Sequence, residues 1–283
     1  MRKKPVLLVV AATLAVLGAA AALVGATVVY GGLYDIGATT QHFQPVYSVL
    51  ERAMRQSVKL RARDIEEPPL ADERMALRGA GCYRDKCVQC HGAPGVAQHD
   101  IGQGIQPIPG PLVDARRHWK PRELYWVTRH GIRMSGMPAW QYRLQDEELW
   151  ALVAFMQRLP DLNAVQYADW MRRAPPAPAC GASPVPAASA PVDIERGRTA
   201  LHQYACVACH TVPGVVGSHS MVGPPLHDMG RRHLIAGTLA NTPGNMVAWL
   251  MRTQEVKPGT AMPQLGVNER DARDMAAYLA TLK

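Results

Sequence analysis

The sequence predicts an all-α protein in which an N-terminal transmembrane helix precedes two small helical domains joined by a Pro/Ala-rich linker. Three observations predict this organisation. The chain begins with a long apolar stretch, residues 173–192 are rich in proline and alanine, and one short cysteine motif occurs on each side of that segment. At 283 residues the chain has the length of about two ordinary domains.

Composition excludes several classes of protein. With 48% hydrophobic and 19% charged residues, the chain is neither disordered nor a polytopic membrane bundle. The net charge of +8 is spread over all parts of the sequence, whereas nucleic-acid binding would gather it on one element. Aromatic residues are scarce, with only 2 Phe, so we expect no aromatic-rich core and something other than side chains in the middle of each domain.

Residues 1–34 are predicted to form a membrane anchor. Three basic residues follow Met1, and no further charge occurs before Asp35. The apolar run 6–30 is long enough to cross a hydrocarbon layer of about 30 Å. A cleaved signal peptide is the alternative, but this run exceeds the usual apolar region of about 7 to 15 residues. The basic residues predict a cytoplasmic N-terminus, and either alternative leaves 35–283 outside the cytoplasm.

The segment 35–70 is predicted to be juxtamembrane and to contain a helix within 43–66. Apolar residues recur in it at four-residue intervals: Val46, Leu50, Met54 and Val58. Pro45 stands near the expected start of this helix. Two alternatives stay open, because the helix either rests on anionic lipid or a partner subunit, or serves as a solvated spacer.

The proline-rich segment 173–192 separates two modules of comparable size, 71–172 and 193–283. It holds 6 prolines among alanine, serine and glycine. Such a composition predicts a semi-rigid, extended tether rather than a packed element.

Four of the 6 cysteines lie in two copies of a Cys-x-x-Cys-His motif. The copies comprise Cys87, Cys90 and His91, and Cys206, Cys209 and His210. This is the pattern of c-type haem attachment. Two thiols on one helical turn reach the two vinyl groups at one edge of a porphyrin, and the adjacent imidazole becomes the proximal iron ligand. The sequence therefore predicts two covalently bound haem c groups.

Other uses of these cysteines fit less well. A four-thiolate zinc site normally draws on two pairs within about 15 to 20 residues, but Cys90 and Cys206 are 116 residues apart. A thioredoxin-like pair would need a strand and helix pattern around it and no repeated histidine. For the remaining Cys82 and Cys180 three alternatives stay open: a disulfide between them, free thiols, or attachment of Cys180 to a lipid or a partner.

Around these motifs the chain resembles the class I cytochrome c family, over most of 71–172 and 193–283. The resemblance implies small all-α units in which an N-terminal helix carrying the motif crosses a C-terminal helix, with haem as the core. These helix pairs are expected over 72–81 and 145–158 in the first module, and over 193–204 and 268–282 in the second. Apolar periodicity supports both C-terminal helices, and Asn268 is a candidate N-cap.

The resemblance also implies a distal methionine on a proline-flanked loop before each C-terminal helix. Met137-Pro138 and Met262-Pro263 match, 46 and 52 residues beyond their motif histidines. Met134 competes with Met137, and the Met-Pro pattern of the family selects Met137. Iron ligated by histidine and methionine passes electrons, whereas an open distal position permits catalysis.

Further residues are implied around the haems. In the family, a proline-containing loop offers a backbone carbonyl to the second imidazole nitrogen, and the loops 110–112, with Pro111, and 223–226, with Pro224, match it. The alternative is that each loop is an ordinary turn whose proline has no chemical role. Trp126 and Trp249 either donate to a haem propionate or pack beside the ring.

The second module resembles the cytochrome domain associated with subunit II of haem-copper oxidases, in segments 211–214, 222–226, 230–232 and 258–263. The resemblance implies a membrane-anchored dihaem cytochrome c, an electron carrier rather than an enzyme. It would pass single electrons from a donor such as a quinol-cytochrome c reductase towards a terminal oxidase or another membrane redox complex. The expected location is the bacterial inner membrane, with periplasmic haem domains and no nucleic-acid partner.

Three alternatives share parts of this chemistry. A dihaem subunit of a cb-type oxidase ranks second, because its signatures differ from the stretch 133–137. A cytochrome subunit of a periplasmic dehydrogenase often has a third haem motif, which the sequence lacks. A dihaem peroxidase would need a haem that opens its distal site, and both Met-Pro loops argue against that.

Overall fold

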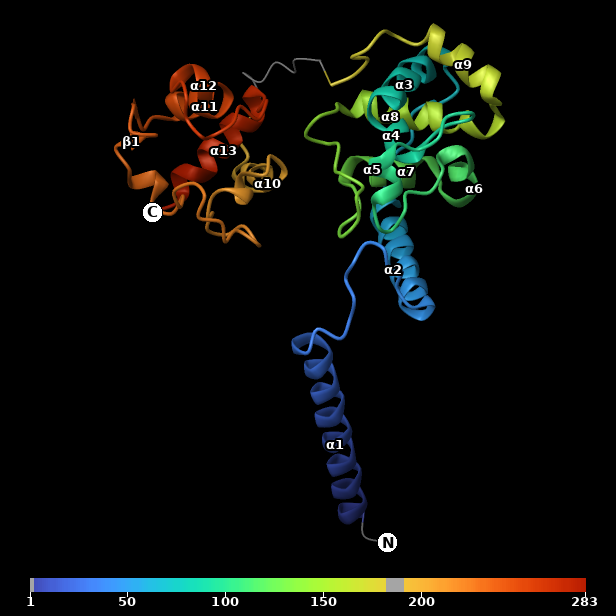
Figure 1. The fold of residues 1–283 in the computed structure, drawn as a ribbon, viewed down its shortest axis with the longest axis vertical. Coiled ribbons are helices and arrows are strands. Elements are labelled where there is room, and N and C mark those ends of the chain that lie inside the picture. The colour runs from blue at the N-terminus through green and yellow to red at the C-terminus, as the bar shows by residue number, and fades with distance from the viewer. Residues whose placement is uncertain (1–2, 182–190) are drawn as a thin grey trace.

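The computed structural model describes residues 3–181 and 191–283. This part of the chain is mostly helical, which confirms the all-α class. Its strands are a short antiparallel pair, β1 (Leu234–Ile235) and β2 (Leu239–Ala240), with Leu234 opposite Ala240. Figure 1 shows one long helix below two helical domains. Residues 1–2 and the linker residues 182–190, which include two of the predicted prolines, lie outside the described residues.

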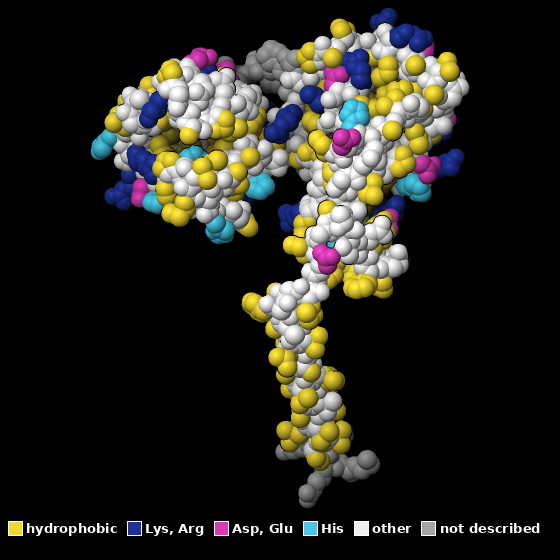
Figure 2. Space-filling model, viewed as in Figure 1, with side chains coloured by type: hydrophobic (Ala, Val, Ile, Leu, Met, Phe, Trp, Pro, Cys, Tyr) yellow, Lys and Arg dark blue, Asp and Glu magenta, His cyan; other side chains and the backbone are white. Residues whose placement is uncertain are grey.

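The long helix α1 (Lys3–Tyr30) has the composition of a membrane span. Its part Pro5–Tyr30 is apolar and lies outside the packed domains, as the yellow side chains of the stalk in Figure 2 show. The hydroxyl of Thr27 donates to the carbonyl of Leu23, so this polar group is satisfied within the helix. An apolar helix that no other described element covers fits the predicted anchor.

The predicted juxtamembrane helix is α2 (Gln44–Ala62), and it packs against α7 (Pro121–His130) of the first domain. Val58 is buried at its C-terminal end. Just beyond the helix, Glu67 accepts a hydrogen bond from Nε of Arg122 at 2.9 Å. The C-terminal part of α2 is therefore packed on the first domain, and the alternative of a solvated spacer is wrong for that part.

In the first domain, α3 (Glu73–Lys86) crosses α8 (Asp146–Met156). The carboxylate of Asp72 caps α3 by accepting a hydrogen bond from the backbone N–H of Arg74 at 2.9 Å. The helix continues beyond its expected end at Gly81, because this glycine is buried in the packed helix and does not terminate it. The other elements are α4 (Val88–His91), α5 (Asp100–Gly104), η1 (Leu112–Asp114), α6 (Ala115–His118), η2 (Leu159–Asp161) and α9 (Ala164–Arg173).

The second domain repeats this plan, with α10 (Ile194–Gln203) crossing α13 (Glu269–Thr281). The predicted cap is confirmed, since the side chain of Asn268 accepts a hydrogen bond from the N–H of Asp271 at 2.9 Å. The helix α11 (Pro243–Met251) packs on α13. The remaining elements are η4 (Cys206–Ala208), η5 (Met229–Arg231) and α12 (Thr253–Val256).

Glycine permits both helix crossings. A Cβ on Gly79 would lie 1.8 Å from the carbonyl oxygen of Ala151 in α8, and a Cβ on Gly197 would lie 2.0 Å from that of Asp274 in α13. Both separations are far below van der Waals contact. In each domain the two helix backbones therefore touch at a position that admits no side chain.

The core of the first domain corrects one expectation, because it contains an aromatic cluster. The ring centroid of Phe155 lies 5.4 Å from that of Tyr83 and 5.7 Å from that of Trp170. Trp170 comes from α9, a helix beyond Pro160 that the sequence pattern did not indicate. The expectation was wrong here because few aromatic residues suffice when they converge at one place.

The start of the proline-rich segment is packed rather than free. Cys180 forms a disulfide with Cys82 in α3, which confirms the first of the alternatives for these two cysteines. The N–H of Ala179 donates to the carboxylate of Asp85 at 2.6 Å, and Arg84 donates to the carbonyl of Pro175 at 3.0 Å. Residues 174–181 therefore belong to the first domain, and the predicted tether is wrong over this stretch.

Gly197→Ala is expected to destabilise the second domain by about 1 to 3 kcal/mol or more, because the new methyl group overlaps the backbone of α13. Gly244→Ala in α11 is the matched control, since its Cβ would meet nothing within 4 Å. This control should be neutral or stabilising by up to about 1 kcal/mol. Urea unfolding followed by circular dichroism measures both, and equal midpoints for the two variants would contradict the crossing geometry.

Candidate functional site

Each Cys-x-x-Cys-His motif forms one tight turn at the end of the first crossing helix. In the first domain the N–H of Cys90 and that of His91 both donate to the carbonyl of Cys87, at 3.1 and 3.0 Å. In the second domain the N–H groups of Cys209 and His210 donate to the carbonyl of Cys206, at 3.2 and 2.9 Å. The structure therefore places two thiols and one imidazole on the same turn in each domain.

Both motif histidines are tied to a backbone carbonyl through Nδ1. His91 Nδ1 lies 2.7 Å from the oxygen of Gly110, and His210 Nδ1 lies 2.7 Å from the oxygen of Pro224. A carbonyl only accepts, so Nδ1 carries the proton and Nε2 keeps its lone pair for a metal. The acceptor in the first domain belongs to Gly110 rather than to Pro111, because Gly110 and Pro224 occupy the same place before a Pro-Leu pair.

Gly223 makes room for the second imidazole. A Cβ at this position would lie 2.4 Å from Cε1 of His210. The Gly223 backbone therefore lies directly beside the imidazole, and the Pro224 carbonyl fixes the rotation of the ring. At Gly110, by contrast, a Cβ would meet nothing within 4 Å.

Burial shifts the pKa of three side chains in the motifs. It raises the pKa of Cys87 to about 12, with a further contribution from Cys90, and raises that of Cys206 to about 11. The pKa of His91 is lowered by burial, against the opposing effect of its hydrogen bond to Gly110. Thiol–disulfide exchange requires a thiolate, so these buried thiols disfavour a redox dithiol. A neutral imidazole is the form that ligates iron.

Each Met-Pro loop contains a hydrogen bond of the same kind. The N–H of Met137 donates to the hydroxyl of Ser135 at 3.2 Å, and that of Met262 donates to the hydroxyl of Thr260 at 3.4 Å. Both methionines are partly buried, whereas the side chain of Met134 is 94% exposed.

The two predicted tryptophans lie in different surroundings. Trp249 is buried in the core of the second domain. Trp126 lies on α7 with its ring centroid 4.8 Å from that of His130. A mostly apolar hollow also opens beside His91, lined in part by Ala93, Val96, Ile108, Pro109 and Val113. Such a lining is suited to an apolar group.

The comparisons with known proteins agree with this geometry. Residues 74–156 match a family model described as cytochrome c oxidase, cbb3-type, subunit III, and residues 194–283 match one described as cytochrome c. The chain contains two cytochrome c-type domains. Their helix-crossing architecture is the one that the resemblance to class I cytochromes predicted.

One curated relative extends the comparison. Cytochrome c oxidase subunit 2 of Alkalihalophilus pseudofirmus is 35% identical over 89 residues, which cover 31% of this chain and 25% of that protein. The alignment thus spans about a quarter of the relative's length. No solved structure matches the chain.

The side chains present fit haem c in both cytochrome domains. Each motif offers two thiols on one turn and a histidine whose Nε2 is free to ligate iron. The Gly223 backbone leaves room for the imidazole of the second domain, and an apolar hollow adjoins that of the first. Cytochrome c domains of this kind bind haem and transfer electrons.

Several supporting residues were not found from the sequence. They include Gly79 and Gly197 at the crossings, and the buried Tyr83, whose hydroxyl donates to the carbonyl of Gly92 at 2.6 Å. The sequence did contain a signal for the two crossing glycines. A glycine precedes the first motif cysteine by 8 residues in one domain and by 9 in the other. The hydroxyl at the second position before each Met-Pro pair was a second signal.

Gly223→Ala is expected to displace the His210 imidazole by about 1 Å. This is the difference between the separation of the new Cβ from Cε1 of His210 and a normal van der Waals contact. We expect a shifted absorption spectrum for the second haem domain and a stability loss of about 1 to 3 kcal/mol. Gly110→Ala is the control, because its Cβ points into open space and its carbonyl is kept. Unchanged spectra for both variants would show that Gly223 does not position the histidine.

Proposed function

We propose that this chain is a membrane-anchored dihaem c-type cytochrome that carries single electrons towards a haem-copper terminal oxidase. One observation carries the proposal: in each domain a single turn presents two thiols and a histidine whose Nδ1 is held by a carbonyl. Bound haem supplies the one-electron exchange, and the protein supplies attachment, ligands and orientation.

Four thiols attach the two haems in this proposal. Cys87 and Cys90 form thioethers in the first domain, and Cys206 and Cys209 form them in the second. His91 and His210 are the proximal ligands. The spacing of each pair on a turn matches the two vinyl groups at one porphyrin edge.

Met137 and Met262 are the proposed distal ligands. The choice of Met137 over Met134 rests on the likeness of the two loops. In each, the N–H of the methionine before proline donates to a hydroxyl two residues earlier. The high exposure of Met134 supports the same choice. A thioether favours ferrous iron, so both haems would have high reduction potentials suited to an oxidase acceptor.

The membrane location follows from α1. An uncleaved α1 with a cytoplasmic N-terminus would hold the haem domains at the outer face of a bacterial inner membrane, in the periplasm. The anchor would then confine diffusion to the membrane plane and raise the local concentration near respiratory complexes. A quinol-cytochrome c reductase is the proposed donor.

A second candidate is a dihaem subunit of a cbb3-type oxidase. The match of 74–156 to subunit III of such oxidases favours it, whereas the relative named as oxidase subunit 2 supports the carrier proposal. Both candidates have the same chemistry and acceptor class. They differ in whether the chain is a permanent part of the oxidase.

Met137→Ala is expected to remove the Met-ligated signal of one haem and to lower one of two midpoint potentials, because the thioether ligand is lost. Met134→Ala is the matched control and should leave both signals unchanged. Near-infrared spectroscopy with redox titration measures both effects. If Met134→Ala removed a signal and Met137→Ala did not, the ligand assignment would be wrong.

Affinity purification from gently solubilised membranes, using the intact anchored chain, tests the acceptor. Copper-containing oxidase subunits in substoichiometric amounts would support a carrier, and equimolar recovery with an oxidase core would support the subunit candidate. Recovery of a quinoprotein dehydrogenase instead would overturn both proposals.

A further inference from the structure

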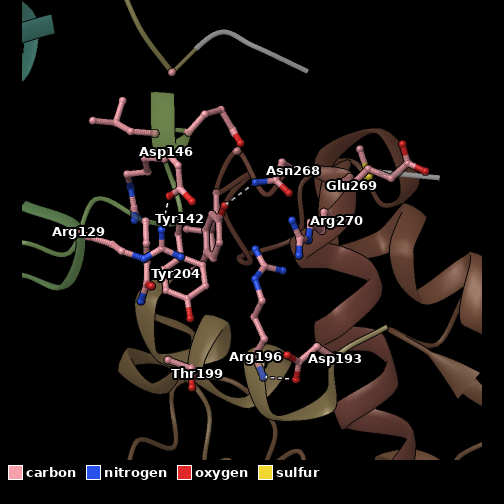
Figure 3. Close-up of a pocket in the computed structure, with 18 of the residues that line it drawn as sticks. Arg129, Tyr142, Asp146, Asp193, Arg196, Thr199, Tyr204, Asn268, Glu269 and Arg270 are labelled. Atoms are coloured by element: carbon pink, nitrogen blue, oxygen red, sulfur yellow. Dashed lines mark hydrogen bonds and ion pairs between the residues drawn. The ribbon is translucent and has the colours of Figure 1, made fainter. Parts of the chain in front are cut away.

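We propose that Tyr142 and Arg143 form an intramolecular docking surface that holds the second haem domain on the distal loop of the first. Figure 3 shows Tyr142 beside Tyr204 where the domains meet. The guanidinium of Arg143 lies 5.3 Å from the ring centroid of Tyr204, and that of Arg196 lies 5.4 Å from the ring centroid of Tyr142. Each domain thus supplies one arginine and one tyrosine to a reciprocal cation–π contact.

Tyr142 packs with the second domain although its sequence position is in the first. Its side chain is 7% exposed and belongs to the apolar cluster of the second domain. Next to it, Arg143 donates from Nη2 to the carbonyl of Gln203 at 3.2 Å. Burial of a large side chain of this kind stabilises the contact. This pair therefore anchors the second domain without forming part of the first domain's core.

Charge complementarity favours the same contact. Arg196 forms ion pairs with Asp271 and Asp274, whose side chains are 0% and 3% exposed. The hydroxyl of Tyr204 donates to Asp271 at 2.7 Å, and Arg143 stacks on the ring of this tyrosine. Arg143 therefore places a further cation on the ring whose hydroxyl binds this carboxylate.

The contact joins the two parts of the chain that lead to the proposed haem ligands. Tyr142 follows Met137 by 5 residues, and Tyr204 precedes Cys206 by 2. Even fully extended, these stretches span at most about 18 and about 7 Å. Docking thus fixes the distal side of one haem site near the attachment turn of the other.

The disulfide supports docking by shortening the connection. Cys180 is held by Cys82, and the N–H of Gly181 donates to Glu148 at 2.8 Å. Only residues 182–190 lie between this fixed point and the described start of the second domain at 191. A short connection gives the docking partners a high effective concentration.

The functional part of this inference rests on the proposed function. If both domains hold haem, docking permits direct exchange between them: one iron loses an electron, the other gains it, and no bond or proton changes. The fixed distance between the two haems then sets the rate of that exchange.

Gadolinium spin labels test the docking in the full anchored chain. They are attached to cysteines introduced at the exposed Arg78 and Arg231, one in each domain. We expect a narrow distance distribution without further substitution, and at least a twofold broader one in Tyr142→Ala and in Arg143→Ala. Arg172→Ala, which removes an exposed arginine paired with Asp169 on α9, is the control and should keep the narrow distribution. Equal widths in all four proteins would overturn the docking.

The same four proteins, checked for unchanged circular dichroism, give a second readout. After flash reduction, electron exchange between the two domains should be at least tenfold slower in Tyr142→Ala and Arg143→Ala than in the other two. Broader distances with an unchanged rate would support docking and overturn its role in electron exchange. A purified chain without haem would refute the proposed function, while the distance distributions would still decide the docking.

Discussion

The backbone contact between two crossing helices determines the arrangement of each haem domain. At Gly79 and at Gly197 any side chain would enter the backbone of the opposite helix. Because the helices touch there, the motif turn at the end of α3 or shortly after α10 is fixed relative to the C-terminal helix. The loops that carry Gly110 and Pro224 then each offer a carbonyl to a defined imidazole.

The two domains stabilise this common plan differently. The first adds α9, a cluster of aromatic rings and a disulfide to the crossing. The second instead buries Arg196 with two aspartates beneath Tyr204. Buried ion pairs contribute little stability on their own, but here the hydroxyl of Tyr204 joins Asp271 to the ring on which Arg143 of the first domain stacks. The same network therefore organises the core of the second domain and holds the tyrosine that Arg143 contacts.

Much of the fold could be predicted from the sequence because its signals are local. The Cys-x-x-Cys-His turns, the cap at Asn268 and the apolar stripe of α13 all depend on residues within a few positions of each other. The features that could not be predicted from the sequence depend on tertiary contacts. The burial of Tyr142 in the other domain, the packing of 174–181 and the acceptor role of Gly110 arise between segments distant in sequence. Local periodicity carries no information about such contacts.

The central claim is that each motif turn holds a covalently attached haem. The intact mass of the purified full chain, measured after denaturation has removed every noncovalent ligand, tests it most directly. The account predicts the polypeptide mass increased by two haem groups, with no free thiol left at Cys87, Cys90, Cys206 or Cys209. A polypeptide that carries one haem or none would contradict it.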